Sequence, residues 1–363
     1  MSHPRSYTIP TLPLEQDLET KAVLRAVNRA NRYLAELKGT CRTIPNENIL
    51  INTLTLQEAK DSSAVENIIT THDELFKAEL YVDRLPNPAT KEVQRYAIAL
   101  RRGFEVVRQH KLITLPHILQ IQSELEENRA GLRKTPGTTL VNDRTGAVVY
   151  EPPQHPDEIK QHMAELVNFI NDERLSPLDP LIKMAVIHHQ FESIHPFYDG
   201  NGRTGRIINI LYLVANDLLD LPILYLSRYI IRNKDEYYRQ LQAVRDHGAW
   251  EDWIIYLLQG VEETARQSIA LIHHIRQLMQ EIKHNLRSEL PKVYSQDLLN
   301  NLFRHPYTKI EFVMEDLRVS RPTASSYLSQ LTEKGLLRMH KIGRSNYYVN
   351  HRLMDILLTA HHA

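Results

Sequence analysis

The sequence is poor in cysteine, in net charge and in glycine, and each shortage excludes a class of protein. A single cysteine, Cys41, in 363 residues excludes an intramolecular disulfide framework and fits a reducing cytosol. The 44 Lys and Arg residues balance the 44 Asp and Glu residues, which argues against a polybasic, histone-like protein. Glycine accounts for 12 residues, about 3% of the chain against a usual value of about 7%. The few glycines therefore need individual attention.

Long apolar runs are missing as well. The first twenty residues are polar and contain three prolines, so they do not resemble a signal peptide. The most apolar stretch, Ile207 to Ile231, is interrupted by Asn, Asp and Pro, whereas a bilayer span needs ~20 mostly apolar residues. We therefore expect a cytoplasmic protein that makes no membrane contact.

Most of the chain has the period of amphipathic helices. Apolar residues recur every three or four positions, for example in Glu15–Lys38, Pro180–Ser193 and Thr204–Leu219. Two β-prone runs, Thr138–Val141 and Ala147–Tyr150, flank a Gly-containing turn and predict one hairpin. The pattern predicts a mainly α fold, a helical bundle with a single β-hairpin.

A second unit with a different pattern follows a long helix predicted from Val261 to about Leu290. Ser320 and Pro322 are an N-cap and a helix-starting proline for a helix from Thr323 to Lys334, and two short strands follow. Helix, helix, turn, helix and ribbon is the order of a small winged helix-turn-helix domain. We expect three parts: an N-terminal helical region (1–110), a core with its connecting helix (111–290) and the winged helix (291–363).

The most informative stretch is residues 195–206, which hold three of the twelve glycines. The turn Gly200-Asn201-Gly202 lets backbone N–H groups point inward at the start of an apolar helix, whose positive end attracts anions. Arg203 and Arg206 lie three positions apart, so both guanidinium groups fall on one face of the first helical turn. This combination favours the binding of phosphate groups.

Two more side chains of the stretch suit chemistry on a polyphosphate. Asp199 could hold a divalent cation between phosphates, and His195 could take a proton from an attacking hydroxyl group. The alternative is a plain loop–helix junction with a Gly-rich turn and solvated arginines. The complete string favours the chemical interpretation.

Residues 195–206 match the Fic motif, His-x-Phe-x-(Asp/Glu)-Gly-Asn-Gly-Arg-x-x-Arg, at every fixed position, so the chain resembles the Fic family. Fic proteins mostly transfer AMP from ATP to a Ser, Thr or Tyr hydroxyl group of a protein. The resemblance implies a nucleotidyltransferase that uses ATP and Mg²⁺, with His195 as general base and Asp199 as Mg²⁺ ligand. The residues that it implies for ATP binding are Gly200, Asn201, Gly202, Arg203, Thr204, Gly205 and Arg206.

Two other functions stay open. A Fic fold could transfer another group, such as UMP, phosphate or phosphocholine, although the intact Gly-Asn-Gly-Arg disfavours the phosphate-transferring relatives. The protein could also be a DNA-binding regulator whose Fic domain senses a nucleotide. His188 and Glu192 lie four apart on the preceding helix, but without a third ligand we expect core side chains there, not a zinc site.

The hairpin and one tyrosine gain roles from the resemblance. In Fic proteins a β-hairpin flap holds the target segment by strand addition, and the run Thr138, Thr139, Leu140, Val141 fits that flap in type and position. A purely structural hairpin would look the same. Tyr237 is the candidate for the ribose or adenine wall, although tyrosines at helical spacing also occur in cores.

A possible inhibitory motif lies near the N-terminus. Residues 62–67 match the family pattern (Ser/Thr)-x-x-x-Glu-(Gly/Asn), with Ser62, Glu66 and Asn67 at its fixed positions. The resemblance implies that Glu66 pairs with Arg206 and so removes the arginine that should hold the γ-phosphate. It leaves open whether the protein also removes AMP. The alternative is a capping box formed by Ser63 and Glu66 at a helix start.

Partners are less defined. We expect a protein substrate with a Ser, Thr or Tyr hydroxyl group, including the protein itself, and leave a homodimer open. Residues 301–363 contain nine Lys and Arg and five Asp and Glu, a net charge of +4, which is modest for DNA binding. DNA and protein contacts through the winged helix stay equal alternatives. The groove candidates are Arg321, Thr323, Ser325, Ser326 and Gln330, with Lys341 and Arg344 on the wing.

Overall fold

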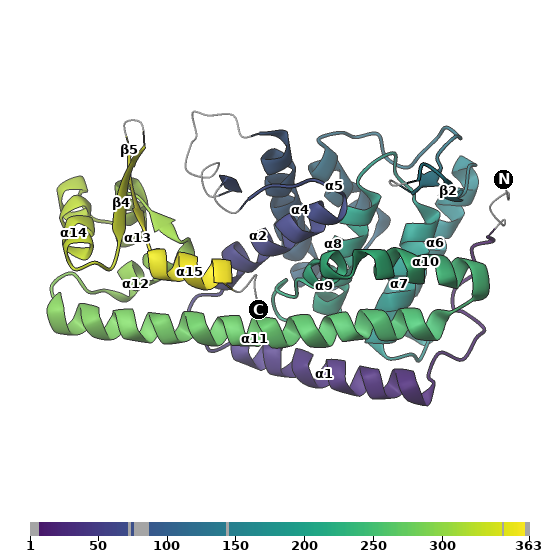
Figure 1. Cartoon of the computed structure of the whole chain (residues 1–363), viewed down its shortest axis with the longest axis horizontal. Coiled ribbons are helices and arrows are strands. Elements are labelled where there is room, and N and C mark those ends of the chain that lie inside the picture. The colour runs from purple at the N-terminus through teal and green to yellow at the C-terminus, as the bar shows by residue number, and fades with distance from the viewer. Residues whose placement is uncertain (1–6, 72–73, 76–86, 143–144, 343–344, 360–363) are drawn as a thin grey trace. The chain divides into compact units, whose positions relative to one another are not determined.

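The computed structural model describes residues 7–71, 74–75, 87–142, 145–342 and 345–359 (Figure 1). Helices dominate, and the described strands form a two-stranded and a three-stranded sheet. The mainly α fold with one hairpin and a small C-terminal domain is therefore confirmed. No helix in the described ranges is long and apolar enough to cross a membrane.

The chain divides into two compact units. Unit 1 comprises Met1–Ala35, Thr55–Thr71 and Pro86–Ala265, and unit 2 comprises Glu36–Leu54, His72–Leu85 and Arg266–Ala363. The division of the sequence into 1–110, 111–290 and 291–363 stays a prediction.

Unit 1 contains the elements around the predicted motif. Their bounds are α1 Lys21–Cys41 and α2 Glu47–Val65, both shared with unit 2, then α4 Pro88–His110, α5 Leu115–Glu126, β1 Leu140–Val141, β2 Val148–Tyr150, α6 Pro156–Asn171, η1 Glu173–Leu175, α7 Pro180–Ile194, α8 Asn201–Ala215, α9 Leu226–Arg232 and α10 Lys234–His247.

The core of unit 1 is built around α7 and α8, which pack on each other (Figure 1). Every residue of α7 from Leu181 to Ile194 is buried, so this helix is covered on all sides. Helix α6 packs on α7, and α4 packs on both α5 and α8. Because α7 ends and α8 begins at the predicted motif, the bundle holds both ends of that loop.

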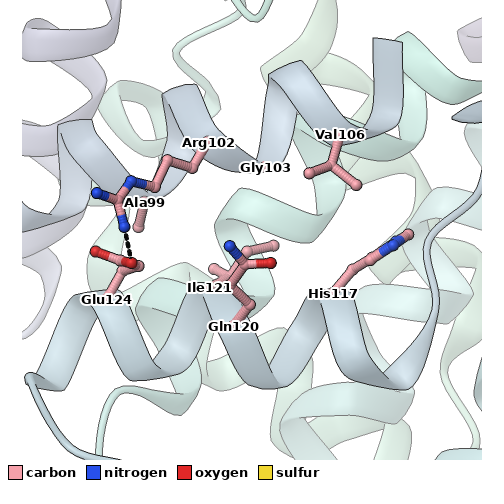
Figure 2. A pocket seen from close by; sticks show the side chains of 8 residues that line it. All are labelled: Ala99, Arg102, Gly103, Val106, His117, Gln120, Ile121 and Glu124. Carbon is pink, nitrogen blue, oxygen red and sulfur yellow. Dashed lines mark hydrogen bonds and ion pairs between the residues drawn. The ribbon is translucent and has the colours of Figure 1, made fainter. Parts of the chain in front are cut away.

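Gly103 shows how closely α4 approaches its neighbours. A Cβ atom there would lie 2.7 Å from Cδ1 of Leu211 on α8 and 3.3 Å from Cδ1 of Ile121 on α5. Figure 2 shows Gly103 facing Ile121 across a small hollow, closed at one end by the ion pair between Arg102 and Glu124. The hollow has about 10 Å³ of free volume, room for about one water molecule. It is a packing defect and not a binding site.

The part of α2 in unit 1 is fastened by a buried glutamate. Glu58 is 1% exposed, and its carboxylate accepts hydrogen bonds from the Tyr96 hydroxyl group (3.0 Å), the Ser227 hydroxyl group and the Ser227 amide (3.2 Å). Burial raises the pKa of Glu58 to about 8, against the opposing hydrogen bonds from Ser227 and Tyr96. These contacts connect α2 to α4 and α9, and so fix the segment that leads to Glu66.

Helix α11, Trp250–Glu289, is longer than predicted. The sequence predicted a helix that begins at Val261, but the helix begins at Trp250 and continues through Gly260. A Cβ atom at Gly260 would lie 2.8 Å from both Leu226 and Tyr229 of α9. The glycine therefore serves close helix packing and does not end the helix.

Unit 2 contains the C-terminal domain. Its elements are α12 Gln296–Arg304, β3 Tyr307–Thr308, α13 Ile310–Leu317, α14 Arg321–Glu333, β4 Arg338–Ile342, β5 Ser345–Val349 and α15 His351–Thr359. The strands are antiparallel in the order β3-β5-β4. The predicted order of helix, helix, helix and ribbon is confirmed, and the structure adds β3 and α15. As expected, Ser320 caps α14 by accepting a hydrogen bond from the Thr323 amide.

Candidate functional site

The loop between α7 and α8, His195–Gly200, is closed by the side chain of Asn201. The Asn201 side-chain amide donates to the Phe197 carbonyl (2.8 Å), and its Oδ1 accepts from the Phe197 amide (2.8 Å). Phe197 itself is fully buried, with its ring 6.2 Å from that of Phe191. Gly200 caps α8 with a left-handed φ of 77°, which favours glycine. The loop is thus a fixed turn that ends at the amino end of α8.

A second brace comes from a residue that the sequence did not single out. Arg133 is fully buried; its Nε donates to the His195 carbonyl (2.8 Å), and its Nη2 donates to the Pro153 carbonyl (2.9 Å). The Arg133 amide also donates to the Pro196 carbonyl (2.8 Å). No local pattern distinguishes this arginine from a solvated one, because its partners lie 20 or more positions away.

His195 ends α7 as a left-handed cap with a φ of 48°. Burial, together with the positive charges of Arg133 and Arg245, lowers the pKa of His195 to about 4, against the opposing charge of Glu66. The imidazole is therefore neutral at neutral pH. A neutral imidazole can accept a proton, as a general base must.

Arg206 is held by the end of α2. Its side chain is 2% exposed; Nη2 donates to Oε1 of Glu66 (2.8 Å) and to the Ser62 carbonyl (2.9 Å), and Nε donates to the Ser62 hydroxyl group (2.8 Å). The structure thus brings together the two segments that the sequence analysis paired, although 140 positions separate Glu66 from Arg206.

Glu66 is ionised and lies against the start of α8. Burial alone would raise the pKa of Glu66, but the charge and hydrogen bond of Arg206 outweigh it and lower that pKa. Burial would likewise lower the pKa of Arg206, yet the Glu66 charge raises it. A Cβ atom at Gly202 would overlap with Oε1 of Glu66. The carboxylate therefore lies directly over the Gly-Asn-Gly turn.

The Ser62–Asn67 segment is the end of a helix and not its start. Helix α2 ends at Val65, the Ile68 amide donates to the Ser63 carbonyl (3.0 Å), and Asn67 is left-handed with a φ of 62°. The capping-box alternative is therefore wrong, since Ser63 lies within α2. Asn67 accepts a hydrogen bond from Lys234 (2.8 Å), so the first residue of α10 also holds this turn.

Arg203 has different partners from Arg206. Its side chain is 4% exposed, Nη1 donates to Glu92 (3.0 Å) and Nη2 donates to Glu126 (2.8 Å). The alternative of solvated arginines is therefore wrong. The sequence analysis did not find Glu92 on α4 or Glu126 on α5, because no motif connects them to the loop.

Thr204 and Gly205 face the protein interior. Thr204 is fully buried, and a Cβ atom at Gly205 would lie 2.8 Å from the Glu192 carboxylate and 3.1 Å from the Phe191 ring, both on α7. These two positions set the close packing of α8 on α7. Their predicted contact with ATP stays a prediction.

Asp199 is the exposed carboxylate of the loop. Its side chain is 75% exposed, and Oδ1 accepts a hydrogen bond from the Gly200 amide (2.7 Å). Among the described residues no group of three or more His, Cys, Asp or Glu side chains could hold a metal. Mg²⁺ often binds to one or two carboxylates together with substrate phosphates and waters. Asp199 is exposed, and its Oδ1 lies 3.8 Å from Nη2 of Arg203. A single exposed carboxylate of this kind fits that mode of binding and does not fit an all-protein metal site.

The predicted hairpin is present but shorter than expected. Strands β1 and β2 pair Leu140 with Tyr150 and Val141 with Val148, whereas Thr138 and Thr139 precede β1. The Tyr150 hydroxyl group donates to the Ser193 carbonyl (2.8 Å), two residues before the proposed base. The hairpin is therefore tied to the end of α7.

Three valines of the hairpin are exposed: Val141 by 48%, Val148 by 43% and Val149 by 38%. Strand β1 pairs only with β2 in its two-stranded sheet. An exposed sheet edge of this kind can pair with another extended segment.

Tyr237 lies in the core and not on an open face. It is 2% exposed, and its hydroxyl group lies 2.9 Å from Nε2 of His188, whose Nδ1 lies 3.0 Å from the Asn209 side-chain amide. Burial lowers the pKa of His188 to about 3, so this histidine is a neutral core residue. In this structure Tyr237 belongs to the packing beneath α8, and its role as a nucleoside wall stays a prediction. The exposed ring is that of Tyr238 (46%).

The predicted recognition helix of unit 2 corresponds to α14. Arg321, at its start, is 63% exposed and donates to Glu311 of α13 (2.8 Å). Lys341 is exposed, and Arg344 lies outside the described residues. DNA and protein contacts through this surface both stay predictions.

Three family models match the chain. The Fic/DOC family N-terminal model matches residues 24–105, and the Fic/DOC family model matches residues 112–213, which include the α7–α8 loop. The C-terminal domain of SoFic-like protein adenylyltransferases matches residues 278–353. The two Fic/DOC models together cover about half of the chain.

Curated relatives are named as protein adenylyltransferases or probable ones. Protein adenylyltransferase fic-1 of Caenorhabditis briggsae is 27% identical over 155 residues, 42% of this chain and 29% of that protein. A probable protein adenylyltransferase of Aquifex aeolicus is 38% identical over 85 residues, 23% of this chain and 25% of that protein. The chain thus spans less than a third of the length of these curated relatives.

Solved structures show the same fold. A Fic family protein from Desulfovibrio desulfuricans G20 superposes with a TM-score of 0.58 at 19% identity, over 91% of this chain and 96% of that one. Residues 134–508 of Fic-1 from Caenorhabditis elegans superpose with a TM-score of 0.54 at 20% identity, over 69% of this chain and 74% of that one. With the loop geometry and the matching family models, the conclusion is that this chain belongs to the Fic/DOC family.

Proposed function

We propose that the protein is a protein adenylyltransferase that transfers AMP from ATP to a Ser, Thr or Tyr hydroxyl group of a protein and is inhibited by its own Glu66. The observation that carries the proposal is the Glu66 carboxylate over Gly202, paired with Arg206 at 2.8 Å. This carboxylate lies where the amino end of α8 and a buried arginine attract an anion. A phosphate group of ATP is the natural competitor for such a position.

In the proposed reaction His195 accepts the proton of the target hydroxyl group as its oxygen attacks the α-phosphorus of ATP. The new bond joins that oxygen to phosphorus, the bond to the bridging oxygen breaks, and pyrophosphate leaves. The neutral state of His195 supports this role. The amides at the start of α8 and the arginines of its first turn would hold the phosphates, since phosphoryl transfer depends mainly on positioning and charge neutralisation.

Asp199 would hold Mg²⁺ together with the phosphates, and the ion would neutralise charge on the leaving pyrophosphate. The exposed Asp199 carboxylate supports this assignment. The hydrogen bond from the Gly200 amide fixes the direction of that carboxylate at the end of the loop.

Inhibition follows from competition for Arg206. While Glu66 and Ser62 occupy its guanidinium group, Arg206 cannot hold the outermost phosphate. ATP then lacks a ligand for its γ-phosphate and binds in an unproductive pose. Removal of AMP from modified targets, with Glu66 aligning a water molecule, is a second activity that the same site would allow.

The test is incubation with α-labelled ATP and Mg²⁺, with detection of labelled protein. We expect weak self-labelling of the wild type, strong labelling of Glu66→Gly and none of His195→Ala. Mass spectrometry of the Glu66→Gly product then identifies both the transferred group and the modified residue. If the protein instead forms a uridylyl, phosphoryl or phosphocholine adduct from the corresponding donor, its activity is one of the alternative reactions and not AMP transfer.

Two outcomes contradict the proposal. Full labelling of His195→Ala would rule out His195 as the base. Labelling of Glu66→Gly at or below the wild-type level would rule out inhibition by Glu66, provided that the thermal unfolding of both variants matches that of the wild type.

A further inference from the structure

A pocket of about 350 Å³ lies at the base of the hairpin in unit 1. Its walls are residues 7–9, residues 150–154 and two side chains of α6, Glu158 and His162. This volume lies in the range that proteins use to enclose small ligands or single side chains. None of the residues assigned to the proposed reaction lines it.

The pocket is adjacent to the proposed base. Strand β2 ends at Tyr150, and the next four residues form one wall of the pocket. The Pro153 carbonyl in that wall and the His195 carbonyl accept hydrogen bonds from the same Arg133 guanidinium group, at 2.9 Å and 2.8 Å. The backbone carbonyl groups of Pro153 and His195 are therefore separated by about the width of one guanidinium group.

The charge of the pocket selects the ligand. Its two ionisable carboxylates are the exposed Glu151 and Glu158, whose side chain is 48% exposed. None of the lining residues is a lysine or an arginine, and among the described residues neither carboxylate pairs with one. His162 lies 3.9 Å from Glu158 and is 12% exposed, so it forms part of the floor. Two arginines lie behind the walls without lining the pocket: Arg245 stands 4.1 Å from the centre of the Tyr150 ring, and Arg133 donates to the Pro153 carbonyl. The charges of the lining itself are the two carboxylates, which attract a cationic group.

We propose that this pocket binds a lysine or arginine side chain of the target segment, close in sequence to the hydroxyl residue that is modified. The inference rests on the proposed function, because it needs an extended segment that presents its hydroxyl group to His195. Such a segment, passing along the hairpin, would place a flanking side chain at the pocket. The substrates are then hydroxyl-bearing segments with a basic residue at one fixed flanking position.

The test uses a positional-scanning peptide library with one central Ser, Thr or Tyr, α-labelled ATP and Mg²⁺. The enzyme is Glu66→Gly, alone and combined with Glu151→Gln and Glu158→Gln. With the two carboxylates intact, we expect about five-fold enrichment of Lys and Arg at one flanking position, as for a partly exposed ion pair. The variant without them loses this enrichment.

A matched control is Glu66→Gly combined with Glu165→Gln. Glu165 is also on α6 and lies 3.8 Å from His162, but it does not line the pocket. This control keeps the basic preference, and thermal unfolding of all variants shows that the fold is retained.

Self-labelling separates the two proposals. If Glu66→Gly labels neither itself nor peptides, the proposed function is wrong. If self-labelling persists while the library is unlabelled, shows no basic preference, or shows the same preference after both carboxylates are removed, the pocket assignment is wrong.

Discussion

The two arginines at the start of α8 lie three positions apart and are both buried, yet their partners belong to different kinds of structure. Arg206 pairs with a single carboxylate, Glu66, one residue beyond the end of α2. Arg203 pairs most closely with Glu92 and Glu126, on the neighbouring helices α4 and α5, and its Nη2 also lies 3.8 Å from Asp199 of the loop. The Arg206 pair can therefore open by movement of a helix end, whereas the Arg203 pairs are part of the helical bundle.

This difference separates a removable contact from a fixed one. Opening the pairs of Arg203 would leave Glu126, whose side chain is 13% exposed, without this ion pair between packed helices, and unpaired buried charges are strongly unfavourable. Opening the pair of Arg206 exposes a carboxylate whose side chain is already 34% exposed. Arg206 is thus the arginine whose charge can be made available to a ligand, while Arg203 keeps the turn in place.

The largest expected effect compares two glutamine substitutions of the same size. Glu66→Gln should raise the initial rate of AMP transfer by about 10- to 100-fold, since hydrogen bonds to charged groups contribute about 1.5–3 kcal/mol. Glu126→Gln should not raise it, because Glu92 still holds Arg203. The measurement is the initial rate with α-labelled ATP. Equal activation by both substitutions would contradict the proposed difference between Arg203 and Arg206.

The same two glutamates should have opposite effects on the pH dependence of stability. The pKa of Glu66 is lowered, so its contribution is present above the ordinary glutamate pKa and is lost as the pH falls through the folded-state value. Burial raises the pKa of Glu126, against the opposing charge of Arg203, so its contribution becomes less favourable as the pH rises above the ordinary value.

Chemical denaturation between pH 3 and pH 8 measures both slopes, with each glutamine variant as the reference for its own position. Relative to Glu66→Gln, the wild type should gain stability as the pH rises. Relative to Glu126→Gln, the wild type should lose stability as the pH rises. Two slopes of the same sign would contradict the assigned charge states.

A smaller effect is expected from the serine that supports Glu66. Ser62→Ala removes the hydroxyl group that accepts from Nε of Arg206 but keeps the carbonyl contact. We expect activation of about two- to ten-fold, less than for Glu66→Gln, because only the donor of this hydrogen bond is charged and a typical hydrogen bond contributes about 0.5–1.5 kcal/mol. Ser63→Ala is the control, because the buried Ser63 hydroxyl group has no hydrogen-bond partner among the described residues. Activation by Ser63→Ala would point to a general loosening of α2.

The smallest effect concerns the α5 side of the loop. The Gln122 side-chain amide donates to the Asp199 carbonyl at 3.3 Å, a long hydrogen bond. Gln122→Ala in the Glu66→Gly background should change the labelling rate by less than about three-fold. We expect this change to arise from a shift in the Mg²⁺ concentration that gives half of the maximal rate. A change in ATP affinity without a change in Mg²⁺ dependence would show that Gln122 does not act through Asp199.

The sequence predicted the parts of the site that are local in the chain. Helix α7 was expected at Pro180–Ser193 and is observed at Pro180–Ile194, because its apolar residues and starting proline are a local signal. Helix α8 begins at Asn201, three residues before the predicted start, since Gly200 caps it in the left-handed conformation.

Contacts between distant segments could not be predicted in the same way. The pairing of Glu66 with Arg206 was expected only from the family motif, because nothing in the residues between them indicates that they meet. Glu126 and Arg133 belong to no such motif. Arg133 nevertheless contacts the α7–α8 loop, and Glu126 contacts the first turn of α8. For Tyr237 the sequence left two interpretations open, since an aromatic side chain at helical spacing fits a core as well as a ligand wall.

The position of Glu66 just beyond the last turn of α2 has a consequence for the kinetics of the proposed enzyme. Helix ends open and close within about a microsecond, far faster than a typical catalytic cycle. Wild-type activity would then be a population average, and a closed state favoured by about 2.7 kcal/mol leaves about one molecule in a hundred open. The rate of AMP transfer falls by the same fraction, because ATP bound to the closed state is in an unproductive pose. An activating partner would need only to trap the unwound end of α2, without any contact to the nucleotide.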